Sequence, residues 1–121
     1  MPTFTTIHGV PIALLDEHGP KLAADRDVTD LFGELWEHKP DVVVVPADRL
    51  TADFFELRTR VAGEIMQKFA NYRLRLVVLG DISDRVAAST SLAALVRESN
   101  QGKHIWFLPT LDDLTERLAG Q

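Results

Sequence analysis

The stretch Asp41-Val42-Val43-Val44-Val45-Pro46 decides the fold of this chain. Its valines are consecutive and do not alternate with polar residues, which indicates a strand that is covered on both faces. Two later apolar runs have the same character, and each is followed by a residue that ends a strand: residues 74–79 by Gly80, and residues 105–108 by Pro109. Strands of this kind are typical of a mostly parallel sheet with helices packed on it.

Helical patterns separate these strands. The core-facing stripe of the first helix consists of Val28, Leu31, Phe32, Leu35 and Trp36, which recur at helical spacing. The predicted helices cover residues 27–38, 52–72, 89–101 and 111–119. Thr51 is the expected N-cap of the second of these helices, and Thr110 with Asp113 resembles a capping box for the last.

The first segment, residues 3–16, predicts two short strands around His8-Gly9. Pro11 has no N–H to donate, so we expect it at the start of a strand or at an edge of the sheet. The resulting element order is ββαβαβαβα, and alternation of strands with helices implies right-handed crossovers. We therefore expect a single α/β domain over residues 1–121.

Composition excludes several classes of protein. The chain has 121 residues, 45% of them hydrophobic, and 13 Lys and Arg against 18 Asp and Glu give a net charge of −5. It contains no cysteine, which excludes disulfides, thiolate chemistry and cysteine metal sites. No apolar run is long enough to span a membrane, and the first residues do not resemble a signal peptide. The excess of acidic residues disfavours binding to nucleic acid. We expect a cytoplasmic protein that contacts no membrane.

The sequence contains no motif that carries a known chemistry. The dinucleotide, P-loop, nucleophile-elbow and zinc-protease motifs are all absent. The histidines have no metal-ligand spacing; they are His8, His18, His38 and His104. We therefore predict no catalytic residues, no metal and no cofactor, and we favour binding over an uncharacterised enzymatic activity.

One face of the second predicted helix is a candidate contact surface for a protein partner or a second copy. Glu64 and Lys68 are spaced for an ion pair between successive turns. The candidate residues on and beside this face are Arg58, Thr59, Gly63, Glu64, Lys68 and Asn71. Residues 58–75 hold five Lys and Arg but a single acid, a net +4 that suits an acidic partner. The alternatives are a solvated face and cations scattered over several faces.

The ends of the predicted strands are a second candidate site. In a doubly wound sheet, ligands collect beyond the carboxyl ends of the parallel strands. Asp81, Ser83 and Arg85 follow one such end, with Asp48 and Thr51 after another, and together they suggest a site for a small anionic ligand or a nucleotide. The alternative is that these residues cap turns and helices.

Several blocks of the sequence resemble a bacterial family of unknown function, numbered 4180. The blocks are Phe54-Phe55-Glu56-Leu57-Arg58-Thr59, Ala62-Gly63-Glu64-Ile65, Gln67-Lys68-Phe69-Ala70-Asn71-Tyr72, Arg75-Leu76 leading to Gly80-Asp81, and Glu98-Ser99-Asn100 leading to Ile105-Trp106-Phe107. The family has no established activity, so this resemblance implies no function.

The end of the chain is more distantly similar to the STAS domains of sulfate transporters and anti-sigma-factor antagonists. The resemblance lies in the element order and in Trp106-Phe107-Leu108-Pro109-Thr110-Leu111-Asp112-Asp113-Leu114. It implies a STAS-like fold and a non-enzymatic regulatory or protein-interaction module. Many antagonists carry a switch serine after the central strand; here residues 46–53 contain no serine, and Thr51 is the nearest hydroxyl.

Overall fold

The sheet contains five strands that lie side by side in the order in which the chain makes them. The computed structural model describes residues 2–120. The strands are β1 (Thr3–Ile7), β2 (Val10–Leu14), β3 (Val42–Pro46), β4 (Arg75–Leu79) and β5 (Ile105–Leu108), in the order β1-β2-β3-β4-β5. β1 pairs antiparallel with β2, and every other pairing is parallel. The α/β class and the mostly parallel sheet are thus confirmed.

A tight hairpin joins β1 to β2. His8 and Gly9 both have positive φ, at 49° and 81°, which matches the twist of a two-residue hairpin loop. Pro11 precedes the residues of β2 that pair with β3, since that register begins at Ile12 opposite Val42. Its carbonyl oxygen still accepts a hydrogen bond from the Asp41 N–H at 2.9 Å. The pairing at this position therefore lacks only the hydrogen bond that an N–H of residue 11 would donate.

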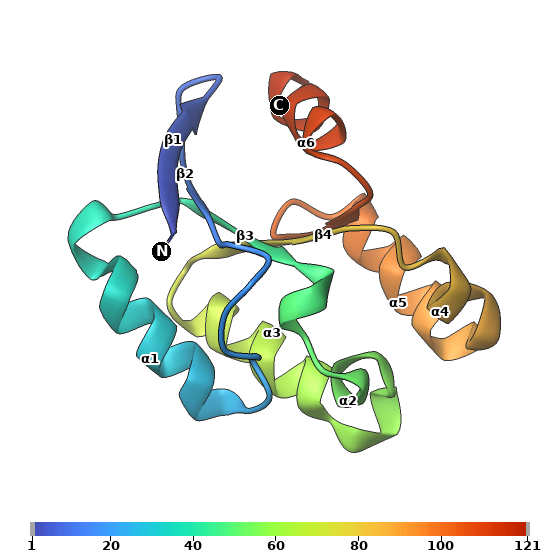
Figure 1. Ribbon diagram of the computed structural model, residues 1–121. Helices are drawn as coiled ribbons and strands as arrows, with labels where there is room; N and C mark the ends of the chain where they lie inside the picture. The colour runs from blue at the N-terminus through green and yellow to red at the C-terminus, as the bar shows by residue number, and fades with distance from the viewer. Residues whose placement is uncertain (1, 121) are drawn as a thin grey trace.

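The helices that connect the parallel strands all lie on one face of the sheet (Figure 1). They are α1 (Asp25–Leu35), α2 (Ala52–Phe55), α3 (Val61–Asn71), α4 (Ser83–Ala88) and α5 (Thr90–Gln101). Strands added in sequential order through right-handed crossovers place each helix on the same side. The sheet is therefore not doubly wound, and among the helices of residues 2–120 only α6 (Leu111–Ala119) covers the opposite face.

The helix predicted over residues 52–72 is broken. α2 ends at Phe55, a 3₁₀ turn occupies Leu57–Thr59, and α3 starts only at Val61. The break is made by Thr59, whose hydroxyl donates to the carbonyl oxygens of Asp53 at 2.6 Å and Glu56 at 2.8 Å. Arg60 then takes a left-handed conformation with φ of 68°. The turn lets α2 bury Phe54 and Phe55 while α3 starts in a new direction.

Other local predictions had mixed outcomes. Thr51 occupies the N-cap position of α2 as predicted, but its hydroxyl is buried and makes no capping hydrogen bond with any described residue. The cap of α6 is confirmed, since the Asp113 N–H donates to the Thr110 hydroxyl at 3.2 Å and that hydroxyl donates to the Asp113 carboxylate at 2.8 Å. The helix α4 was missed, and α1 begins at Asp25, ahead of the predicted Asp27.

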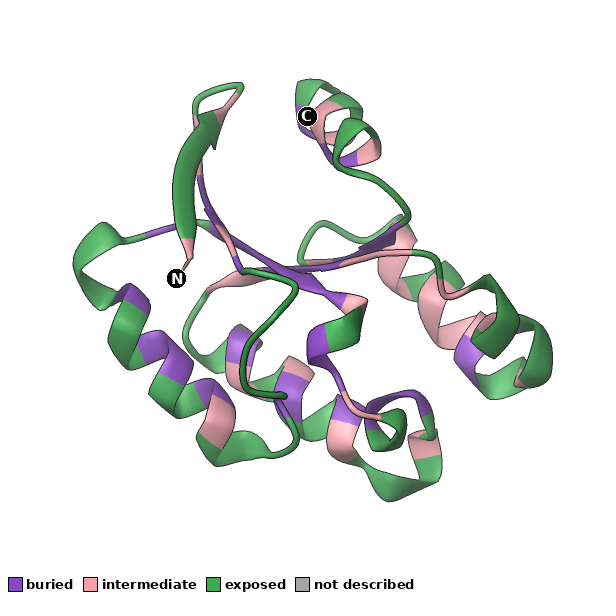
Figure 2. Ribbon diagram, viewed as in Figure 1, coloured by how far each residue is buried: buried purple, intermediate pink, exposed green. Residues whose placement is uncertain are grey.

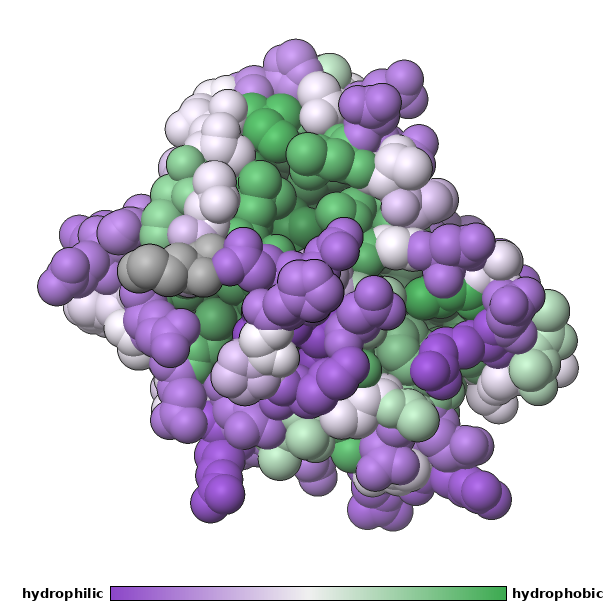
Figure 3. All heavy atoms as spheres, in the orientation of Figure 1, coloured by the Kyte–Doolittle hydropathy of each residue, from purple (hydrophilic) through white to green (hydrophobic). Residues whose placement is uncertain are grey.

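The core has two layers, one on each face of the sheet, and the central strands are buried by both (Figure 2). The larger layer lies against α1, α2, α3 and α5 and includes Phe32, Phe54 and Phe69. The smaller layer lies beneath α6 and contains Ile12, Val42, Val44, Val77, Trp106, Leu108, Leu114 and Leu118. Apolar side chains remain accessible in the hollow between the hairpin and α6 (Figure 3). Ile7, Val10, Leu14 and Leu79 are the partly buried members of this layer.

Because α6 is the sole helix that the described part of the chain places on this face, truncating its buried anchor should destabilise the domain strongly. Leu114 is fully buried, whereas Leu111 on the same helix is 40% exposed. We expect Leu114→Ala to lower the free energy of unfolding by about 2–5 kcal/mol. Leu111→Ala should cost less than about 1 kcal/mol. Urea denaturation measures both, and equal losses would contradict this account of α6.

The left-handed conformation of Arg60 gives a second prediction. Glycine adopts positive φ without the steric cost borne by other residues, and the Arg60 side chain is exposed. Arg60→Gly should therefore raise the free energy of unfolding by about 0.5–1 kcal/mol, with Arg60→Ala as the control that brings no gain. A loss of stability in Arg60→Gly would instead favour the continuous helix predicted from the sequence pattern.

Candidate functional site

The structure does not assemble the predicted contact face on the long helix. Lys68 lies 3.1 Å from a carboxylate oxygen of Asp25 in α1, so it pairs across two helices rather than with Glu64. The Lys68 side chain is only 22% exposed, and its ammonium lies 5.9 Å from the centre of the Tyr72 ring. Asn71 accepts a hydrogen bond from Gln67 at 2.8 Å. Gly63, Glu64 and Asn71 are exposed, whereas Lys68 is half-buried.

Arg58 and Thr59 lie at the opposite end of α3, in the 3₁₀ turn that precedes it. The Thr59 hydroxyl is occupied by the hydrogen bonds that break the helix. Arg58 projects into solvent, with its side chain 85% exposed and 3.5 Å from Glu56. The predicted set is therefore divided between two ends of one helix.

The candidates at the end of β4 make local structural contacts. The Asp81 carboxylate accepts the Ser83 N–H at 2.9 Å, at the start of α4. Hydrogen bonds from the Ser83 side chain and then its backbone hold the pKa of Asp81 below its ordinary value. The Arg85 guanidinium lies 4.6 Å from the centre of the Phe55 ring. These contacts favour the capping interpretation of this segment over a ligand site.

A different surface gathers exposed aromatic and basic side chains where α1 and α3 end. We call Trp36, Lys39, Tyr72 and Arg73 the aromatic edge. Trp36 is 73% exposed and Tyr72 is 47% exposed, which is unusual for such large side chains. The four residues line a hollow of about 410 Å³ together with Phe32, Leu35, Pro40, Asp41 and Leu74. The Tyr72 ring is fixed against Phe32, with ring centres 4.8 Å apart.

Trp36 does not belong to the core stripe of the first helix, so the prediction from helical spacing is wrong for this residue. α1 ends at Leu35, and Trp36 opens a tighter 3₁₀ turn that ends at His38. A 3₁₀ turn advances each side chain by a larger angle than an α-helix does, so Trp36 leaves the buried stripe. The Lys39-Pro40 pair that stops the helix was the available signal.

The aromatic edge continues into a basic surface at the amino ends of β4 and β5. A neighbouring hollow of about 490 Å³ shares Asp41, Arg73 and Leu74 with the hollow beside the aromatic edge. It extends as far as His104. Arg75 donates to the Lys103 carbonyl oxygen at 2.9 Å and lies over the Trp106 ring. Burial lowers the pKa of Arg75, and the charge of Asp41 opposes that effect. The cationic segment 58–75 is thus split, with Arg58 and Arg60 at the far end of α3.

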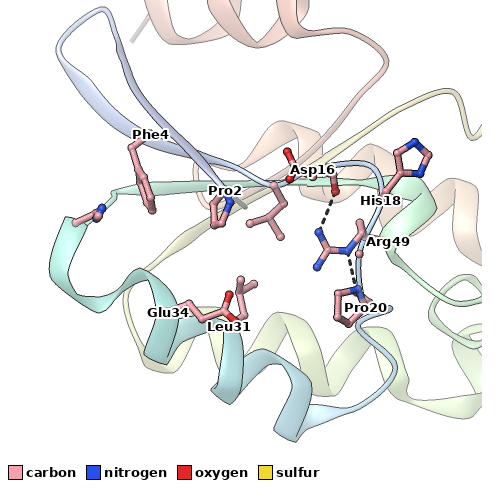
Figure 4. Close-up of a pocket in the computed structure, with 11 residues that line it drawn as sticks. Pro2, Phe4, Asp16, His18, Pro20, Leu31, Glu34 and Arg49 are labelled. Carbon is pink, nitrogen blue, oxygen red and sulfur yellow. Dashed lines mark hydrogen bonds between the residues drawn. The ribbon is translucent and has the colours of Figure 1, made fainter.

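A third concave region among those described lies between the hairpin and α1 and was not predicted. It has a volume of about 590 Å³ (Figure 4). At one end is Arg49, which follows β3 and is only 9% exposed. Its Nε donates to the Pro20 carbonyl oxygen at 2.8 Å and its Nη1 to the Asp16 carbonyl oxygen at 2.9 Å. A buried arginine has no distinctive pattern in a single sequence, so only the structure could reveal it.

Over residues 2–120, no cluster of three or more His, Cys, Asp or Glu residues is arranged to hold a metal ion. None of the helices in the same range has the length and apolar character needed to cross a membrane.

Comparison with known proteins gives one match. The model of a family described as "Domain of unknown function (DUF4180)" matches residues 7–118. No curated protein and no solved structure matches the chain.

The observed partner of Lys68 can be tested by double-mutant cycles. A cycle between Asp25 and Lys68, with alanine at each position, should give a coupling energy of about 0.2–1 kcal/mol, as expected for a partly exposed pair. The cycle between Glu64 and Lys68 should give no coupling beyond experimental error. Thermal or urea unfolding measures both, and a larger coupling to Glu64 would support the interpretation from sequence instead.

Proposed function

The chain belongs to the family described as a domain of unknown function (DUF4180), and we propose that it is a protein-interaction module that binds an acidic partner segment at the aromatic edge. The observation that carries the proposal is the exposure of Trp36 and Tyr72 side by side with Lys39 and Arg73 around one hollow. No enzymatic chemistry is part of this proposal.

The aromatic side chains supply the expected binding energy. Trp, Tyr and Arg are the residues most enriched at the energetic centres of protein interfaces, because they bury large areas and lose little conformational freedom. Tyr72 is already held against Phe32 by a ring contact and lies beneath the Lys68 ammonium. A ring that is fixed before binding loses less entropy when a partner covers it.

The charges favour an acidic occupant. The whole chain carries −5, so the Lys39 and Arg73 cations make this edge electrostatically distinct from the molecule around it. Neither cation has an ion-pair partner among the described residues. Asp41, the acid that lines the same hollow, would repel a carboxylate near it, so the partner's acids should lie towards Lys39 and Arg73.

The proposal includes the finer assignments that the sequence suggested. It keeps the assignment to a STAS-like regulatory domain in the bacterial cytoplasm, and the element order and the sequential five-stranded sheet of residues 2–120 favour the STAS-like fold in that assignment. The Thr51 hydroxyl is buried, so the proposed binding does not depend on its phosphorylation. A second copy of the chain is the alternative partner, and its acidic surface would have to dock at the same edge.

Selection from a random peptide library displayed on phage tests the proposal. We expect the immobilised protein to enrich peptides that combine Asp or Glu with an aromatic residue or proline. Trp36→Ser combined with Arg73→Glu should lose at least about tenfold in affinity for these peptides, since it removes an aromatic anchor and reverses a charge. The affinity of the unaltered protein should fall as salt is added.

The matched control is Arg58→Glu, which makes the same charge change at the far end of α3 on a side chain that is 85% exposed. Binding to the selected peptides should be unchanged in this variant. The proposal is wrong if no acidic peptides are enriched, or if the aromatic-edge variant binds them as well as the unaltered protein. Sedimentation at increasing protein concentration tests the alternative partner, a second copy of the chain. Self-association through this edge would appear in the unaltered protein and be lost in the aromatic-edge variant.

A further inference from the structure

We propose that the cavity at Arg49 is a binding site for a small organic monocarboxylate with an apolar body. The cavity lies beyond the carboxyl ends of β2 and β3, between the hairpin above it and α1 below it (Figure 4). This proposal is independent of the aromatic edge, which lies where α1 and α3 end. It rests on a buried charge, on the chemistry of the walls and on the size of the space.

The buried charge is the guanidinium of Arg49. The residue is 9% exposed, and its two hydrogen bonds go to the neutral carbonyl oxygens of Pro20 and Asp16. The Asp16 carboxylate also lines the cavity, and a side-chain hydrogen bond and then nearby positive charges, Arg49 among them, hold the pKa of this carboxyl below its ordinary value. It makes no ion pair with the guanidinium, and neither does any other carboxylate among the described residues. Burying a cation without an anion in contact is costly, so an anionic ligand that reached the guanidinium would gain more than it would at the surface.

The guanidinium is also held in one orientation. Its carbonyl partners clamp Nε and Nη1, and Gly19 lies so close that a Cβ there would come within 3.0 Å of Cζ. Figure 4 shows the terminal nitrogens turned towards the cavity. A donor fixed in this way loses little entropy when it binds an oxygen, which is the advantage of a preorganised site.

Apolar side chains form part of the cavity wall away from Arg49. Leu15 and Leu31 line it, and Phe4 lies at the far end, where its ring is 3.7 Å from that of His38. The volume of about 590 Å³ lies within the range of small-molecule sites, about 300–1,000 Å³. A ligand with its anionic group at Arg49 would therefore place an apolar body against these walls.

The anion should carry a single charge. Two of the Arg49 nitrogens already donate to carbonyl oxygens, so few donors remain for the several oxygens of a phosphate. Glu34 also lines the cavity, and a second negative charge on the ligand would increase its repulsion. These features favour a carboxylate over inorganic phosphate or a nucleotide.

Titration of the ¹⁵N-labelled protein, followed by NMR, tests the site with four probes: hexanoate, its neutral analogue hexanamide, acetate and inorganic phosphate. We expect saturable shifts on hexanoate addition, largest at the Arg49 Nε–H and the Gly19 amide. Hexanamide should bind at least about tenfold more weakly, because it lacks the charge that strengthens the hydrogen bond to arginine. Acetate, which lacks an apolar body, and phosphate should also bind more weakly than hexanoate.

Two variants make the test specific. Arg49→Gln should lose at least about tenfold in hexanoate affinity. Because this change also removes a clamp on the loop, a second variant leaves Arg49 in place: Glu34→Lys, at an exposed position of α1, should tighten hexanoate binding about two- to fivefold by reversing a repulsive charge. Its control is Glu64→Lys, which makes the same charge change on α3, away from the cavity, and should leave binding unchanged.

Each of several outcomes would overturn the proposal. These are the absence of saturable shifts at Arg49 and Gly19 with hexanoate, equal affinities for hexanoate and hexanamide, stronger binding of phosphate than of hexanoate, or identical effects of Glu34→Lys and Glu64→Lys. If Arg49→Gln does not fold, the comparison of the two lysine variants still decides the question.

Discussion

The constraint on which the structure depends is the order of the strands. Because the chain adds each parallel strand beside the last, right-handed crossovers place every connecting helix on the same face of the sheet. The opposite face is left with α6 and the curled hairpin, and its apolar side chains are only partly covered between them. The same order removes the point at which a doubly wound sheet reverses direction, where a ligand crevice would otherwise open. Polar residues at the end of β4 thus have no crevice to line, and Asp81 and Arg85 are used in local contacts instead.

The parts of the fold that could be predicted from sequence are those in which local chemistry and burial agree. The valine run required covering on both faces, and β3 is buried throughout. Thr110 caps α6 as its spacing with Asp113 indicated, and Pro11 precedes the parallel ladder that it could not join. In each case one short-range rule was sufficient, and the tertiary structure supplied nothing that opposed it.

The failures lie where a side-chain hydrogen bond or a change of helix type overrides the periodic pattern of the sequence. Thr59 breaks the long helix by binding two carbonyl oxygens behind it, which helical periodicity alone does not register. Trp36 satisfied the spacing of a core residue but follows the last α-helical turn, so the geometry of the 3₁₀ turn exposes it. Arg49 becomes distinctive only through partners at Asp16 and Pro20, far away in the chain. The cavity therefore depends on a residue that no local pattern marks, and the aromatic edge on one whose only local signal is the Lys39-Pro40 pair after it.

The two edges of the sheet are protected differently, β5 by a side chain and β1 not, and this difference affects where a partner can bind. The side chain of Asn100 accepts the Phe107 N–H at 2.7 Å and donates to the Phe107 carbonyl oxygen at 3.1 Å, so an amide takes the place of a neighbouring strand beside β5. β1 has no such cover in the described part of the chain; it is uncharged, and all of it except Ile7 is exposed. Natural sheets commonly protect an edge with charged residues, with proline or by keeping the edge strand short, and within β1 only the short length is present.

Because β1 also forms one side of the hollow that α6 leaves open, a segment paired with this strand would both extend the sheet and cover its apolar face. Specific binding at the aromatic edge places the partner at the ends of α1 and α3, away from that strand, where side chains rather than backbone pairing determine which partner is bound.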